Sequence, residues 1–117
     1  MEKGYHYGKI ILNASAIRST DAVTTAAAVI EGLSKKSLIV INGLDQNISV
    51  QIQGAYTEGS AFINVGTGQT VNAGVNDFIG QTEVAELVNY IPCVRATVTA
   101  AIIPTSGTVT IYVVATN

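Results

Sequence analysis

Short segments in which apolar and polar residues alternate occupy much of the chain, and this pattern predicts β-strands. Residues 47–54, 94–100 and 108–114 each alternate with a period of two. Such a period is typical of a strand that buries one face and exposes the other. The side predicted to be buried consists of Ile48, Val50, Ile52, Val94, Ala96, Val98, Ala100, Val109, Ile111 and Val113. The opposite side of these strands carries a single charged residue, Arg95.

Other segments predict strands with less regular patterns. Residues 9–17 read as a short apolar strand, and residues 61–65 and 69–73 predict two more between glycine turns. The run SLIVIN at 37–42 is apolar at four consecutive positions. It therefore suits a strand that is buried on both faces, or one at the centre of a sandwich.

Two segments could form either helix or strand. The alanines of residues 22–36 would allow a helix. Their β-branched neighbours favour a strand that ends at Gly32, but whether 22–30 is strand or helix stays open. Within 82–92, the sequence EVAELV could form one helical turn. We favour a strand with a short turn at Asn89-Tyr90, because a proline and a strand pattern follow.

The spacing of these strands predicts the fold class. Several short strands at intervals of roughly 8–12 residues, separated by glycine turns, indicate an all-β protein, an antiparallel β-sandwich of jelly-roll-like type. We expect residues 94–103 to pair with the last strand as a hairpin across the PTSG turn. We also expect Phe62, Phe78 and some tyrosines to supply the aromatic bulk of the core. Residues 1–8 read as an N-terminal arm, and residues 9–117 as a single β-sandwich domain.

Composition and charge narrow the function. The 117 residues are 48% hydrophobic and only 12% charged, with a net charge of −2. The few basic residues are scattered, whereas a nucleic-acid-binding protein needs a basic stripe, so we expect no nucleic-acid partner. No apolar run approaches the roughly 18 residues of a membrane-spanning helix, and the N-terminus is a poor signal peptide. We therefore expect no membrane partner and a protein made in a cytosol.

The residues that usually carry chemistry are sparse. Cys93 is the one cysteine and His6 the one histidine, so neither an internal disulfide nor a cluster of cysteines and histidines around a metal is expected. Cys93 reads as a small buried hydrophobe. The acidic residues considered for catalysis are Asp45, Glu58, Asp77, Glu83 and Glu86. No pair of nucleophile and base can be nominated. The sequence therefore predicts no enzyme, no metal site and no cofactor.

The low charge instead indicates association with other chains. Residues 46–57 and 96–117 contain no charged side chain, although exposed strand edges are normally protected by charge. Such strands are either central in a sheet or covered by another subunit. The polar, glycine-rich arm would become ordered only by docking, which makes Tyr5, His6 and Tyr7 candidate interface residues. A different possibility is that Tyr5, Tyr7, Tyr56 or Tyr90 stacks on a sugar ring.

Two stretches of the sequence resemble a known group of proteins. These are KKSLIVINGLDQNISVQIQGAYTEGSAFINVG and YIPCVRATVTAAIIPTSGTVTIYVVAT, within residues 34–117 or so. They resemble small β-sandwich proteins and terminal domains of tailed-bacteriophage virions, such as head decoration (cement) proteins, head fibres and tail accessory proteins. The sequence departs from that pattern at Ala61-Phe62, where a tryptophan would stand, and residues 1–33 have no clear counterpart.

This resemblance implies a virion structural protein without enzymatic activity, often a trimer, that adds to a major capsid or tail protein. It implies that Arg95 bridges strands or subunits and that Gly107 provides a positive φ in the last turn. The leading expectation is a capsid decoration or minor head protein that stabilises the shell through subunit interfaces, located in the virion after assembly in the host cytoplasm. The alternatives are a glycan-binding module on a virion or tail, and a filament-forming subunit that donates residues 9–17 as a strand.

Overall fold

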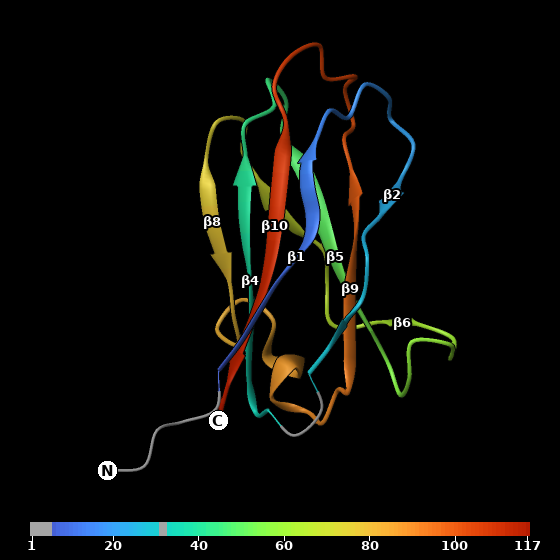
Figure 1. The fold of residues 1–117 in the computed structure, drawn as a ribbon. Coiled ribbons are helices and arrows are strands. Elements are labelled where there is room, and N and C mark those ends of the chain that lie inside the picture. Colours follow the sequence, from blue (N-terminus) through green and yellow to red (C-terminus); the bar gives the residue numbers. More distant parts are fainter. Residues whose placement is uncertain (1–5, 31–32) are drawn as a thin grey trace.

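Two antiparallel β-sheets face each other in the computed structural model, which describes residues 6–30 and 33–117 (Figure 1). The four-stranded sheet has the order β1-β10-β4-β8. Its strands are β1 (His6–Ser15), β10 (Val109–Thr116), β4 (Lys35–Asn42) and β8 (Asn76–Ile79). The predicted fold class, an all-β antiparallel sandwich, is confirmed.

The six-stranded sheet has the order β2-β9-β5-β6, with β3 also paired to β9 and β7 also paired to β5. Its strands are β2 (Val23–Thr24), β3 (Ala28–Val29), β5 (Ile48–Ala55), β6 (Ile63–Asn64), β7 (Gln69–Val71) and β9 (Cys93–Thr99). A single 3₁₀ turn, η1 (Ala85–Val88), is the one helical element of the described residues. In Figure 1 it lies at the end of the sandwich where the C-terminus also lies.

The core between the sheets is aliphatic. The inward residues of β5, β9 and β10 that the alternation predicted are all buried, and Cys93 is buried as well. The aromatic bulk expected in this core is absent from it, because Phe78 is 55% exposed and Phe62 is only half-buried. That expectation was wrong because the alternation of β8 turns Ile79 inward and Phe78 outward. Among the described aromatic residues, Tyr7 alone packs against the core, and only in part.

The last strand is central in its sheet, and the predicted terminal hairpin is wrong. Strand β10 pairs with β4 from Val109 opposite Asn42 to Thr116 opposite Lys35, and it pairs with β1 on its other side. Strand β9 belongs to the other sheet, where it pairs with β5. The connection of residues 100–108 therefore crosses between the sheets, and the turn residues in it do not make a tight hairpin. The uncharged terminal strand is protected by strands of its own chain.

Three further segments differ from the expectation. Residues 22–30 are extended, as favoured, but form two short pieces, and Gly32 lies outside the described residues. Residues 85–88 form η1, so the strand favoured within 82–92 is wrong there. Strand β1 begins at His6, so the last three residues of the predicted arm belong to the four-stranded sheet, while residues 1–5 lie outside the described part.

Candidate functional site

The outer face of the four-stranded sheet carries a straight row of large apolar side chains. Cross-strand pairing places Ile10 opposite Tyr112, Tyr112 opposite Ile39, and Ile39 opposite Phe78. Directly opposed residues of neighbouring strands point to the same face. The inward positions of these strands are occupied by core residues, so this row points outward. We call Ile10, Tyr112, Ile39 and Phe78 the apolar row; it crosses all four strands of the sheet.

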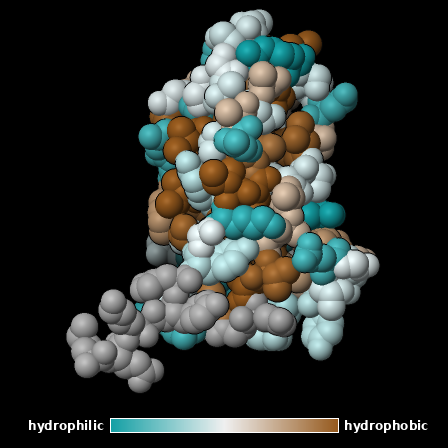
Figure 2. Space-filling model, in the orientation of Figure 1, coloured by the Kyte–Doolittle hydropathy of each residue, from teal (hydrophilic) through white to brown (hydrophobic). Residues whose placement is uncertain are grey.

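The apolar row is accessible. Ile10 is 45% exposed and Phe78 is 55% exposed, while Tyr112 and Ile39 are half-buried. The residues on either side of the row are uncharged: Gly8, Val114 and Ser37 on one side, Thr110, Ile41 and Asn76 on the other. Figure 2, which views this face, shows hydrophobic surface over the middle of the sheet. A broad, uncharged apolar surface of this kind is a typical protein-contact surface.

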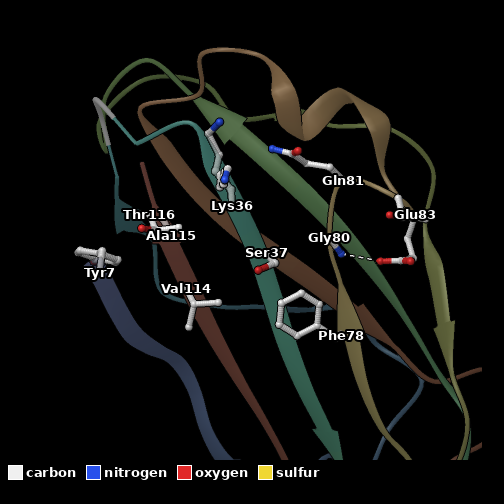
Figure 3. A pocket seen from close by; sticks show the side chains of 12 residues that line it. Tyr7, Lys36, Ser37, Phe78, Gly80, Gln81, Glu83, Val114, Ala115 and Thr116 are labelled. Atoms are coloured by element: carbon white, nitrogen blue, oxygen red, sulfur yellow. Dashed lines mark hydrogen bonds between the residues drawn. The ribbon is translucent and has the colours of Figure 1, made fainter. Parts of the chain in front are cut away.

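A hollow of about 870 Å³ lies on the same face, next to the apolar row. Figure 3 shows that Tyr7, Val114, Ser37 and Phe78 border it from the sheet. Its far rim is polar and includes Glu83, whose carboxylate accepts a hydrogen bond of 2.7 Å from the Gly80 backbone N–H. Burial raises the pKa of Tyr7 above its ordinary value, with a smaller contribution in the same direction from the Glu58 charge and an opposing one from a hydrogen bond with the Val29 backbone.

Lys36 lies beside the hollow but has a structural role. Its side chain is buried, and its ammonium donates hydrogen bonds to the carbonyl oxygens of Leu87 at 2.9 Å, Asn89 at 2.8 Å and Ser34 at 3.3 Å. Burial lowers the pKa of Lys36 below the ordinary lysine value. The ammonium satisfies carbonyls at the end of η1 and fastens that turn to β4. We therefore do not assign it to ligand binding.

A second hollow, of about 320 Å³, lies beside the two-residue strand β6. Tyr56, Ile63 and Tyr90 border it and are 75%, 70% and 68% exposed, respectively. The structure thus brings together two of the four tyrosines that the sequence offered for sugar stacking. The rest of its lining is also apolar and consists of Gly54, Ala55, Ala61, Val65, Ile91 and Pro92.

The predicted interface residues do not form one patch. Tyr5 lies outside the described residues, and for His6 only the backbone is described, which pairs with Thr116. Tyr7 lies in the four-stranded sheet, where it borders the larger hollow, whereas Arg95 lies on β9 of the other sheet. An interface role for these residues stays a prediction.

Arg95 does bridge strands of its own sheet. Its Nε donates a hydrogen bond of 2.9 Å to Gln53 on β5, and its guanidinium lies 4.0 Å from the centre of the Phe62 ring. This arrangement ties the loop before β6 to β5 and β9. Gly107 has φ of 84°, which confirms the positive φ expected at that position.

Sequence reasoning missed the apolar row. The signal that could have found it was SLIVIN, whose outward Ile39 and Ile41 are as apolar as its inward residues. The pattern predicts a strand that is buried on both faces, or one at the centre of a sandwich. Strand β4 is an inner strand of its sheet, and within the described residues only its inner face is buried. The row itself became visible only when the register placed Ile10 and Phe78 in line with Ile39.

The part of the chain that the structure describes offers no candidate for a metal site or for a membrane-spanning helix. Within residues 6–30 and 33–117, no group of three or more histidine, cysteine, aspartate or glutamate side chains could hold a metal ion. In the same ranges, no helix has the length and apolar character needed to cross a membrane.

Comparison with known proteins shows the fold. No protein-family model matches the sequence, and no curated protein matches it. Among solved structures, the PBSX exported protein XepA has a TM-score of 0.65 at 15% identity, covering 93% of this chain and 36% of XepA. The VP2 subviral particle of infectious bursal disease virus has a TM-score of 0.55 at 11% identity, and the match covers 98% of this chain and 33% of the VP2 chain.

A structure of the Gx strain of the same virus gives a TM-score of 0.54 at 11% identity, with 98% and 32% coverage. The chain therefore spans about a third of the length of each of these proteins. At such identities the likeness establishes a shared β-sandwich fold and nothing about activity.

Proposed function

We propose that this chain is a virion structural protein, a capsid decoration (cement) or minor head protein that attaches to the shell and stabilises it without catalysing a reaction. Two observations support the proposal. Nearly the whole chain shares its fold with a protein of a subviral particle. Its four-stranded sheet carries the exposed apolar row on its outer face.

The proposed mechanism is a clamp. A small sandwich seated over a junction between capsid subunits adds buried surface on both sides of the junction, and this surface must be separated before the subunits move apart. A standard specific interface buries about 1,600 Å² in total, and aromatic residues usually supply most of its energy. On this chain the aromatic side chains available on the outer face of the four-stranded sheet are Phe78 and Tyr112.

Particles from the source organism provide the test. Virions purified by density gradient would be digested and analysed by mass spectrometry, with the copy number of this chain compared with that of the major capsid protein. We expect a fixed ratio that survives repeated banding. A chain that stays in the soluble fraction, with none in the particle band, would refute the proposal.

The second hollow supports one alternative, a glycan-binding module on a virion or tail. Tyr56 and Tyr90 both border that hollow and are well exposed, as rings that stack on sugars must be. A glycan array probed with the chain and with its Tyr90→Ala variant tests this role. The role predicts that the unchanged chain binds particular glycans and that the variant does not. Strand donation by residues 9–17 finds less support, because β1 already pairs with β10 of its own chain.

The number of copies in the assembled form follows from mass measurements. The family resemblance favours a trimer. Light scattering coupled to size-exclusion chromatography distinguishes one, two and three chains of 12.1 kDa.

A further inference from the structure

We propose that the outer face of the four-stranded sheet packs face to face against the same face of a second copy of this chain. The inference rests on the proposed structural function for its biological purpose, and it assigns to a second copy of this chain the same face that supports that function. It comes from the apolar row, the uncharged residues beside it and the hollow at its edge.

The central strands of this face have the composition of strands that are covered on both sides. Strand β4 places Leu38 and Val40 in the core and turns Ile39 and Ile41 outward. Strands that alternate apolar and polar residues usually face water on one side, whereas strands that are apolar throughout are buried on both. At Ile39 and Ile41 the outer face of β4 therefore has the residues of a buried surface, whereas the outward residues nearer its start are Lys35 and Ser37. Nothing in the described part of this chain covers this face.

The charge of the face identifies a second copy as the occupant. The apolar row and the residues beside it contain no charged side chain, so the centres of two identical faces meet without repulsion between like charges. The charged Lys35, opposite Thr116, lies at the end of β4 and borders the hollow. The nearby Lys9 directs its ammonium away to the carbonyl oxygen of Ala27, at 2.7 Å. A partner that binds through complementary charge could form no ion pair at the centre of this face.

The shape of the face also permits self-association. Phe78 projects from the sheet at 55% exposure and stands at the border of the 870 Å³ hollow. In a two-fold interface the same patch is used by both copies, so a projection on one copy can enter the hollow on the other, and the reverse. Sheets packed in this way lie about 10 Å apart with interdigitated side chains.

The area of the face sets the expected strength. The four strands have 10, 8, 8 and 4 residues. With about 4.8 Å between strands and a rise of about 3.3 Å per residue, they give a footprint of roughly 500 Å² per copy. The roughly 1,000 Å² buried in total lies at the lower end of specific interfaces. We therefore expect a reversible pair that forms as concentration rises, rather than a permanent dimer.

Sedimentation equilibrium of the purified full-length chain tests the inference, from about 5 µM to about 500 µM because an interface of this size is weak. We expect the mass to rise from 12.1 kDa toward twice that value. Phe78→Ser should weaken the association by roughly thirtyfold or more, as loss of an aromatic anchor does. Ile63→Ser is the matched control, because Ile63 is 70% exposed and lies beside the other hollow, on the six-stranded sheet.

The outcomes separate this inference from the proposed function. Association that is weakened by Phe78→Ser and by Tyr112→Ser, but unchanged by Ile63→Ser, supports the face-to-face pair. A chain that remains monomeric throughout, or that loses association only with Ile63→Ser, overturns it. A monomer that still occurs in purified virions overturns the pair and leaves the proposed function intact. Thermal unfolding of each variant verifies that the fold is retained, as expected for side chains outside the core.

Discussion

Replacement of Gly107 by alanine should destabilise the protein far more than the same replacement at Gly74. Both glycines have positive φ, 84° at Gly107 and 72° at Gly74. They differ in their surroundings. A Cβ on Gly107 would lie 1.9 Å from the carbonyl oxygen of Gly43, whereas a Cβ on Gly74 would have nothing within 4 Å. The pair therefore separates the cost of backbone strain from that of a collision between two chain segments.

The magnitude follows from these two contributions. A positive φ costs an alanine about 1–2 kcal/mol, and this applies at both positions. At Gly107 the turn around Gly43 must also move, which disturbs the hydrogen bonds from Gly43 N to Thr108 O at 2.8 Å and from Asp45 N to Ser106 O at 3.3 Å. Each such bond contributes about 1 kcal/mol. We expect a loss of about 3–4 kcal/mol for Gly107→Ala and about 1–2 kcal/mol for Gly74→Ala.

Urea unfolding followed by far-UV circular dichroism measures both variants. With a denaturant slope of about 2 kcal/mol per molar, the Gly107→Ala midpoint should fall by about 2 M, and that of Gly74→Ala by less than about 1 M. Equal shifts for the two variants would show that the close approach of residues 43 and 107 contributes nothing. The reasoning about how the connection between β9 and β10 is held would then be wrong.

Three further changes test other parts of the structure. Burial lowers the pKa of Lys36, so the unfolded chain binds more protons than the folded one as the pH approaches the ordinary lysine pKa of about 10.4. Stability should therefore rise toward that pH, and Lys36→Met should lose this rise. Urea unfolding measures it in a Tyr7→Phe background, because the raised pKa of Tyr7 would add a pH dependence of its own. The same Lys36→Met variant should lose about 1–3 kcal/mol at neutral pH, because three carbonyls lose their donor. Hydrogen bonds from the Thr105 hydroxyl and backbone N–H lower the pKa of Asp45. The stability that this contact contributes is therefore present above about pH 4 and is lost as the pH falls further. The thermal midpoint of Asp45→Asn should fall less on acidification than that of the unchanged protein. Arg95→Ala should lower the free energy of unfolding in urea by about 1–2 kcal/mol, because it removes the Gln53 hydrogen bond and the Phe62 contact. An unchanged free energy of unfolding would contradict the bridging role.

The strands were predictable because their information is local. Alternation along 47–54 fixes which side chains of β5 face the core, and the structure buries Ile48, Val50 and Ile52. Strand pairing is not local. The PTSG turn resembles the turn of a hairpin, yet the connection is anchored to the β4–β5 turn through Asp45 and sends β10 into the other sheet. This contact joins residues 60 positions apart, and no pattern within the turn reveals it.

The candidate site was less predictable, because it depends on register between four strands. The sequence identified the outward residues of β10, among them Tyr112, but it could not align them with Ile10 and Phe78, which are distant in the chain. The tyrosine pair of the second hollow was missed for the same reason. Tyr56 and Tyr90 belong to separate loops that meet only in the folded chain.

The way the sheet edges are protected indicates how copies of the chain can meet. At the β1 edge, the segment after β2 closes the sandwich, because Ala26 N–H donates to Ile11 O at 3.0 Å while Thr25 N–H donates to Ala96 O of the other sheet at 2.9 Å. At the opposite edge, β8 is only four residues long and carries Asp77. Short, charged or covered edges resist the addition of further strands. Association through strands would also extend without limit, whereas association through a face is closed once two copies meet. The protected edges therefore favour a finite assembly. In it, β10 lies inside its own sheet and contributes Tyr112 to the face that we propose a second copy covers.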